Sequence, residues 1–157
     1  MTSHWLMKSE PHVYPWSQLV KDGSTHWDGV RNYQARNIMR DQMKVGDMVL
    51  FYHSNCKPPH VAGIAKVCKE AYPDFTAQDP GSKYFDPKAT PENPRWMMVD
   101  IEPIMELNPV TLPELRLNGD LEGMPLLMRG QRLSVQPVSA EHFAIVCQIG
   151  GLDSNSL

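Results

Sequence analysis

The densest group of residues with binding chemistry lies in the segment Thr25-His26-Trp27-Asp28-Gly29-Val30-Arg31-Asn32-Tyr33-Gln34-Ala35-Arg36-Asn37. Asn32, Arg36 and Arg40 recur every four residues, so on a helix they form one polar and cationic stripe. Trp27 comes just before the start of that predicted helix. Two interpretations stay open at this point: a solvated helix face beside a core tryptophan, or an aromatic wall for a planar ligand beside cations that bind phosphates.

A second group of polar residues stands where two predicted strands end. Lys8-Ser9-Glu10-Pro11 closes the first strand, and Ser54-Asn55 follows the strand that ends in Tyr52-His53. Small polar residues at strand ends are usually turn chemistry. They can equally line the mouth of a small barrel, where ligand sites tend to occur.

Several other kinds of site have no support in the sequence. The six histidines and three cysteines show no HExxH, CxxC or HxH spacing, so we expect no metal site. No GxSxG nucleophile elbow and no GxGxxG or GxxxxGK phosphate loop is present, so we expect no cofactor and assign no catalytic residue.

Length and composition limit the class of protein. The 157 residues suit about one domain, and 41% of them are apolar, which is typical of globular chains. No window reaches the roughly 18 uninterrupted apolar residues of a membrane helix, so we expect no membrane partner. Three widely spaced cysteines argue against a disulfide framework and favour the cytoplasm. The net charge of −3 means that any nucleic-acid binding depends on a local basic patch. The sequence does not decide the oligomeric state.

Strand signals dominate the rest of the chain. Apolar runs predict strands at residues 4–7, 47–53, 61–67, 95–106 and 132–136. Helical spacing and capping residues predict short helices at 15–21 and 32–43, a third that begins at Thr111, and a fourth at 139–149. The proline-rich and aromatic segment 72–94 is predicted to be a packed excursion. This pattern favours an α+β fold around a small barrel.

Six blocks of the sequence resemble the EVE domain family. They are Trp5 to Pro11, Trp27 to Asn37, Gly46 to Ser54, Ala71 to Asp74, Asn93 to Trp96 and Arg132 to Val138, in family order across residues 5 to about 149. The resemblance implies a single domain over 1–157 with its core at about 4–149, and a PUA-like mixed β-barrel with short helices packed outside. It also implies kinship with YTH domains, which hold a methylated adenine in an aromatic cage.

The resemblance further implies a reader of modified bases in DNA or RNA, with 5-methylcytosine-type bases favoured. Because the catalytic motifs are missing from the sequence, we expect it to bind without turnover. The expected partner is therefore a nucleic acid carrying a modified base, extruded into a pocket walled by Trp27. The expected pocket residues are Lys8, Ser9, Glu10, Trp27, Val30, Ser54, Tyr84, Leu133, Ser134 and Gln136, of which Leu133, Ser134 and Gln136 rest on the family match. Arg31, Asn32 and Arg36 are expected at the flanking phosphates.

Several alternatives stay open. Tyr84 is either a second aromatic wall of the pocket or a tyrosine packed under its own loop. The protein could be an enzyme acting on nucleotides or nucleic acid, for which Glu10, Asp28 and Lys8 are the available acids and bases. It could also be a small-molecule sensor or a partner-binding module, which would need no basic patch.

Overall fold

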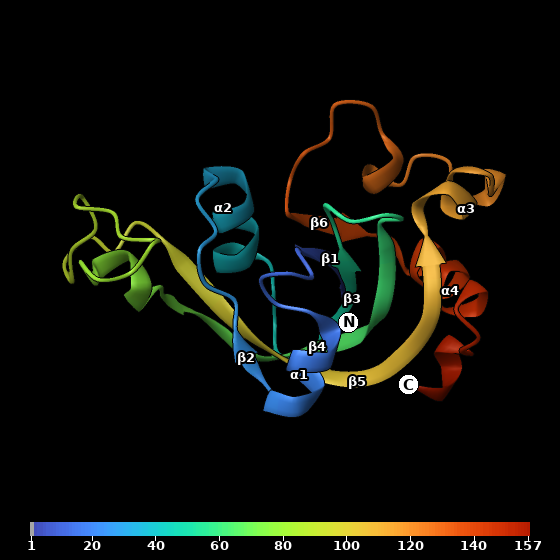
Figure 1. The fold of residues 1–157 in the computed structure, drawn as a ribbon, viewed down its shortest axis with the longest axis horizontal. Coiled ribbons are helices and arrows are strands. Elements are labelled where there is room, and N and C mark those ends of the chain that lie inside the picture. The colour runs from blue at the N-terminus through green and yellow to red at the C-terminus, as the bar shows by residue number, and fades with distance from the viewer. Residues whose placement is uncertain (1) are drawn as a thin grey trace.

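The computed structural model describes residues 2–157, and in them the chain forms one six-stranded sheet and four α-helices (Figure 1). The strand order is β2-β5-β4-β3-β1-β6. The strands are β1 (His4–Ser9), β2 (Thr25–His26), β3 (Met48–His53), β4 (His60–Pro73), β5 (Met97–Thr111) and β6 (Val135–Val138). β1 and β3 run parallel, whereas the other neighbours in the sheet are antiparallel.

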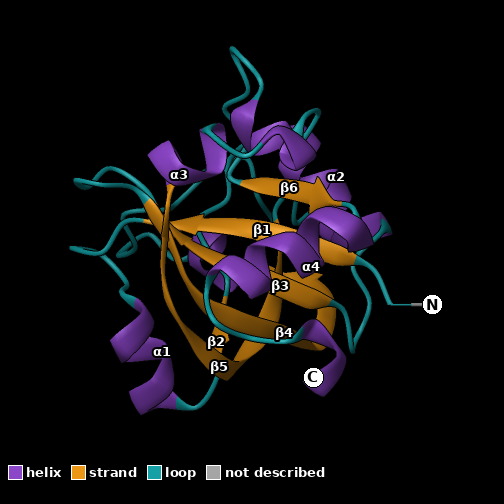
Figure 2. Cartoon of the chain, turned by 90° about the vertical axis from the view of Figure 1, so that its right-hand side faces the viewer, coloured by secondary structure: helices purple, strands orange, loops and turns teal. Residues whose placement is uncertain are grey.

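The sheet is strongly curled, because the long strands β4 and β5 shift register at four places along their pairing (Figure 2). Within residues 2–157 the edge strands β2 and β6 do not pair, so the sheet stays open. The predicted PUA-like α+β fold is confirmed, and its barrel takes the form of this curled, open sheet.

Local sequence signals explain where the helices begin and end. Helix α1 (Trp16–Asp22) ends at Gly23, which adopts a left-handed conformation and donates its N–H to the Leu19 carbonyl. Helix α3 (Leu112–Arg116) begins with the predicted capping box of Thr111 and Glu114. Helix α4 (Ala140–Ile149) begins at the predicted N-cap Ser139.

Helices cover both faces of the sheet and create two apolar cores. On the first face, Trp5, Met7 and Phe51 pack with α1 and with α2 (Tyr33–Asp41); we call it the α2 face. On the second, Leu6 and Leu50 pack with α3 and α4; we call it the α4 face. Side chains alternate between the faces because successive residues of a strand point to opposite sides.

All five predicted strands have somewhat different ends in the structure, and the difference is largest in β4, β5 and β6. β1 continues to Ser9 and β3 begins at Met48. β4 continues to Pro73, and β5 runs to Thr111 rather than Glu106. β6 begins at Val135 rather than Arg132, and its Pro137 is accommodated because β6 is an edge strand. The two-residue strand β2 has no sequence signal of its own, since it is set by pairing with β5.

The segment 72–94 forms the packed excursion that the sequence predicts. It projects from the ends of β4 and β5 at the left of Figure 1 and contains a 3₁₀ turn, Phe75–Gln78. Ala77, Ala89 and Trp96 make a small third core there. The Trp96 indole N–H donates to Asp86 Oδ2 at 2.7 Å.

Candidate nucleic-acid interface

Trp27 lies in the loop between β2 and α2, at the edge of the core on the α2 face. Its backbone N–H donates to the Val99 carbonyl at 2.7 Å, which fixes the start of the loop. Its ring meets Phe51 edge-on, with 5.7 Å between the ring centroids and 87° between the planes. Only 9% of Trp27 and 7% of Val30 is exposed. Trp27 is therefore a core residue that presents a narrow rim to solvent.

A buried carboxylate holds this loop in shape. Asp74 is completely buried and its Oδ2 accepts hydrogen bonds from the Gly29 N–H at 2.9 Å and from Arg31 Nη1 at 3.0 Å. Burial alone would raise the pKa of Asp74, but hydrogen bonds from Thr76, Gly29 and Arg31 outweigh it and lower the pKa below its usual value. The carboxylate is thus ionised and ties the excursion to the Trp27 loop.

The three residues expected at phosphates use their side chains within the protein. Arg31 donates to Asp74 and, through Nη2, to the Tyr84 carbonyl at 2.7 Å. Asn32 is the N-cap of α2 and accepts from the Ala35 N–H at 3.0 Å. Arg36 donates to the Arg95 carbonyl at 2.7 Å. In the unbound protein these side chains stabilise the loop and the start of α2.

The polar residues at the ends of β1 and β3 do come together. The Ser54 N–H donates to the Ser9 carbonyl at 2.9 Å, and the Ser9 hydroxyl donates to the Tyr14 carbonyl. Glu10 is exposed; its Oε2 lies 2.9 Å from His12 Nε2 and accepts a hydrogen bond from Asn55 at 3.4 Å. These residues form turns at one end of the sheet.

The sheet register separates the remaining pocket residues. Lys8 pairs with Tyr52 and Gln136 pairs with Leu6, which places both side chains on the α4 face, opposite Trp27. Ser134 contributes its carbonyl, which accepts from the Lys8 N–H at 2.9 Å. Leu133, by contrast, packs against the core of the α2 face. The structure therefore brings Leu133, but not the Lys8 and Gln136 side chains, to the side of Trp27.

Lys8 and Gln136 are both unusual on the α4 face. Burial lowers the pKa of the Lys8 ammonium, and within residues 2–157 it makes no ion pair. Gln136 is only 1% exposed; its Nε2 donates to the Leu133 carbonyl, while its Oε1 has no partner among the described residues.

Tyr84 lies against the Trp27 loop rather than only under its own segment. Gly29 has a φ of +78°, and a Cβ there would come within 2.7 Å of the Tyr84 ring. The Arg31 guanidinium lies 5.7 Å from the centre of that ring. The loop backbone, the ring and the cation thus form one packed unit.

Sequence reasoning missed an aromatic and cationic cluster on the outer side of α2. Tyr33, which is 48% exposed, stacks on Trp96 with 4.7 Å between the centroids and 21° between the planes. Arg36 lies 4.6 Å from the centre of the Tyr33 ring, and Arg95 donates to the Tyr33 hydroxyl. Arg95 has a φ of +62°, which is rare for a residue with a side chain. Its members belong to two sequence blocks, Trp27 to Asn37 and Asn93 to Trp96, but neither block signals that they meet.

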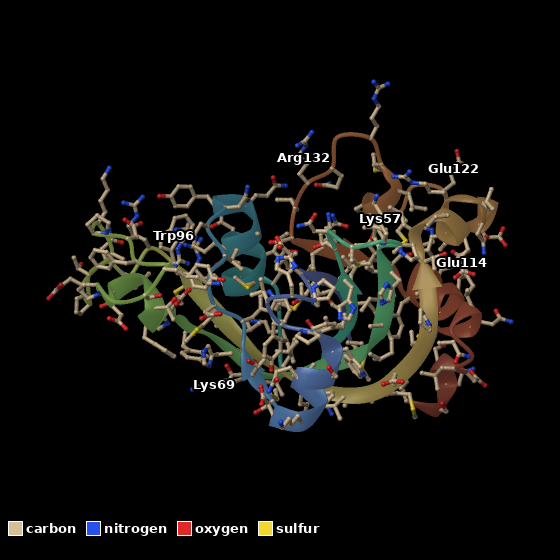
Figure 3. All side chains as sticks on the ribbon, viewed as in Figure 1. Lys57, Lys69, Trp96, Glu114, Glu122 and Arg132 are labelled. Atoms are coloured by element: carbon tan, nitrogen blue, oxygen red, sulfur yellow. The ribbon has the colours of Figure 1, made fainter. Side chains whose placement is uncertain are left out.

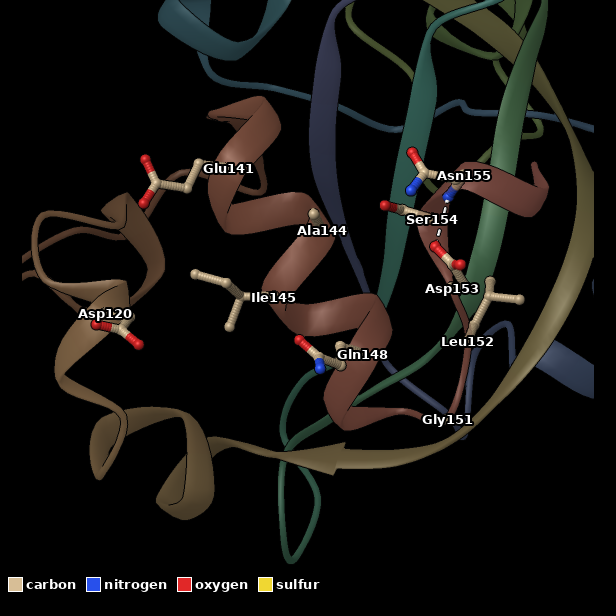
Figure 4. A pocket seen from close by; sticks show the side chains of 10 residues that line it. All are labelled: Asp120, Glu141, Ala144, Ile145, Gln148, Gly151, Leu152, Asp153, Ser154 and Asn155. Carbon is tan, nitrogen blue, oxygen red and sulfur yellow. Dashed lines mark hydrogen bonds between the residues drawn. The ribbon is translucent and has the colours of Figure 1, made fainter.

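Two cavities differ sharply in their chemistry. One of about 340 Å³ lies between α2 and the segment before β6. Another, of about 920 Å³, lies beside α4 and carries Asp120, Glu141 and Asp153, whose charge would repel phosphates (Figure 4). In residues 2–157 no group of three or more His, Cys, Asp or Glu side chains could hold a metal ion. None of the helices described there is long and apolar enough to cross a membrane.

These features define the class of the protein as a PUA-like α+β domain, and solved structures of the same fold support that assignment. A family model described as the EVE domain matches residues 3–149. The chain belongs to the EVE domain family.

Relatives and solved structures match nearly the whole chain. Human thymocyte nuclear protein 1 is 41% identical over 173 residues, which cover 95% of this chain and 74% of that protein. A hypothetical protein from Leishmania major is 50% identical, covers 96% of each chain and superposes with a TM-score of 0.91. Human thymocyte nuclear protein 1 in complex with 5-methylcytosine containing DNA is 41% identical, covers 95% of this chain and 98% of that one, and has a TM-score of 0.87.

Proposed function

We propose that this EVE domain binds nucleic acid that carries a modified base, with 5-methylcytosine in DNA as the first candidate, and does no chemistry on it. The observation that carries the proposal is the likeness over 95% of the chain to a protein whose structure holds 5-methylcytosine containing DNA. The word "nuclear" is part of that relative's name and says nothing of this chain, for which a cytoplasmic location remains a prediction.

The proposed pocket lies on the α2 face beside Trp27. The modified base leaves its stack and lies against the Trp27 ring, which contributes about 1–3 kcal/mol of binding free energy. Val30 and Leu133 supply the apolar contact for a methyl group, and Ser9, Glu10 and Ser54 hydrogen-bond the edge of the base. Because Trp27 is only 9% exposed when unbound, part of its surroundings moves aside as the base enters, and we propose the half-buried Leu133 segment, which packs against the same core, for this movement.

The remaining predicted residues act around this pocket. Lys8 and Gln136 act from the α4 face, Lys8 by attracting the anionic strand and Gln136 by holding the Leu133 carbonyl. Ser134 fixes the same segment to β1, and Tyr84 supports Gly29 as part of the pocket wall. Arg31, Asn32 and Arg36 position the loop, and Arg36 and Arg31 place positive charge beside the strand.

A matched pair of variants tests the role of Trp27. Trp16 and Trp27 are both buried and both meet Phe51 edge-on, at 5.5 and 5.7 Å between centroids. Anisotropy with matched oligonucleotides should give wild type a preference for 5-methylcytosine over cytosine of about 10- to 200-fold. Trp27→Phe should lower that preference, whereas Trp16→Phe should lose similar stability and keep it. Equal affinity of the wild type for both oligonucleotides would overturn the proposal.

Nucleoside mass spectrometry separates binding from turnover. After hours of incubation with the methylated oligonucleotide, the proposal expects the nucleoside composition to be unchanged. A product that grows with protein concentration and disappears in Glu10→Gln would establish an enzyme instead.

A further inference from the structure

The cavity of about 340 Å³ between α2 and the segment 125–137 shares only Leu133 with the proposed pocket. Four of its side chains are primary amides, from α2, its C-cap and the loop before β6, and its apolar surface includes an indole and a leucine. The residues that matter are Gln34, Asn37, Gln42, Gln131, Trp5 and Leu133. The volume falls within the range of small-ligand sites and exceeds the needs of a single water.

The cavity and the proposed base pocket share one residue. Leu133 lines the cavity and also packs against the apolar core of the α2 face, to which Trp27 and Val30 belong. Trp5 forms part of the floor; it is 4% exposed and its indole N–H donates to Asp47 at 2.8 Å, which fixes the ring. A rigid aromatic floor beside the pocket suits a second planar group.

The amides supply the polarity that a base edge requires. Each amide offers one acceptor and two donors, and Asn and Gln side chains typically read base edges through such paired bonds. Among the described residues, the Gln34 and Gln42 side chains make no hydrogen bond within the protein, so both are available to a ligand.

A cation lies in the chain between two lining residues. Arg132 is exposed, stands between Gln131 and Leu133, and makes no ion pair or side-chain hydrogen bond within residues 2–157. Figure 3 shows it on the limb of the 128–134 loop that lies nearer to α2. Arg31 and Arg36 are already hydrogen-bonded within the protein, so Arg132 is better placed to meet a phosphate.

We propose that this amide-lined cavity binds the nucleotide next to the modified base on the same strand, with its base against Trp5 and its phosphate at Arg132. The proposal rests on the proposed function and extends it: the domain reads the sequence context of the modification as well as the modification itself. Gln34 and Gln42 are the residues that discriminate among flanking bases.

The test is the affinity for 5-methylcytosine oligonucleotides in which each flanking position carries each of the four bases. Wild type should prefer one flanking base by roughly tenfold. Gln34→Ala combined with Gln42→Ala should abolish that preference and leave the ratio of methylated to unmethylated affinity unchanged. The control is Gln148→Ala, an exposed amide on α4, which should change neither quantity.

The outcomes separate the two proposals. A wild type without a flanking preference, or a double variant that keeps it, overturns the role of the cavity even when the methylation preference is intact. A flanking preference that the double variant loses, in a protein indifferent to methylation, supports the cavity and overturns the proposed function. Arg132→Gln should also reduce the salt dependence of binding by about one unit on duplex DNA, and an unchanged slope removes Arg132 from the proposal.

Discussion

Replacement of Asp74 by asparagine tests how the Trp27 loop is held. The carboxylate is completely buried and accepts from the Gly29 N–H, Arg31, and both the N–H and the hydroxyl of Thr76. Asparagine keeps the shape but places an NH₂ group where one carboxylate oxygen stood. That NH₂ group then faces either the Gly29 N–H and Arg31, which donate to Oδ2, or the two donors of Thr76, which donate to Oδ1. In addition, the Arg31 guanidinium loses its counter-ion.

The magnitude follows from burial. Breaking a buried ion pair by removing one partner typically costs about 3–5 kcal/mol. We expect about 3 kcal/mol here, because the Arg31 side chain remains 24% exposed and can be partly solvated. For a chain of 157 residues, each kcal/mol lowers Tm by about 2–4 °C, so Tm should fall by about 6–12 °C.

Thermal unfolding followed by circular dichroism measures the effect. The control is Asp79→Asn in the same segment, where the carboxylate is exposed and accepts only the Gly81 N–H, and Tm should change little. The lowered pKa of Asp74 means that its contribution is full above about pH 4 and is lost as pH falls through its folded-state pKa. The gap between wild type and Asp74→Asn should therefore narrow in strong acid. A Tm within 2 °C of wild type at pH 7, by the scale of roughly 2–4 °C per kcal/mol, would refute the reasoning.

Three further outcomes follow from the same structure. Burial, and then the neighbouring His60, lowers the pKa of His53, so the unfolded chain binds more protons than the folded one and Tm should fall as pH drops from about 7 to 5. His53→Gln should flatten this dependence of Tm on pH, and parallel Tm–pH curves for wild type and variant would contradict the prediction. Burial raises the pKa of the Cys147 thiol to about 11, so iodoacetamide should label it only after unfolding, whereas mass spectrometry that finds it modified in the native protein would contradict its burial. Gly29→Ala should lower the free energy of unfolding by about 1–3 kcal/mol more than Gly23→Ala. Both glycines have a φ of +78°, but only at Gly29 would the added Cβ contact the Tyr84 ring. Equal losses of stability would mean that the Tyr84 ring moves away freely.

Much of the fold could be predicted because local signals and long-range packing agree. Thr111 and Ser139 each begin a helix for reasons that lie within four residues of sequence. The sequence predicted where the strands lie but not where they end. The long β4 and β5 continue because they pair with each other along their length, and no local sequence pattern encodes that pairing. The strands β5 and β6 also continue through Pro109 and Pro137, which a bent strand and an edge strand can accommodate.

The arrangement of the site was less accessible. The resemblance placed Lys8 and Trp27 in one pocket, but their side chains lie on opposite faces of the sheet. Trp27 and Met7 pack in the core of the α2 face, and Lys8, one residue after Met7 on β1, points to the other face. The partnership of Arg31 with Asp74 joins residues 43 positions apart, which spacing cannot predict. The left-handed backbone conformation of Arg95 and its contact with Tyr33 depend on how the excursion folds, and no local sequence pattern predicts either.

The most direct test of the central claim is a crystal structure of this protein bound to a duplex that contains one 5-methylcytosine. The proposal predicts that the methylated base lies outside the helix, on the α2 face, with its ring stacked within about 4 Å of Trp27. A methylated base that stays paired in the duplex, or that lies on the protein away from Trp27, would contradict it.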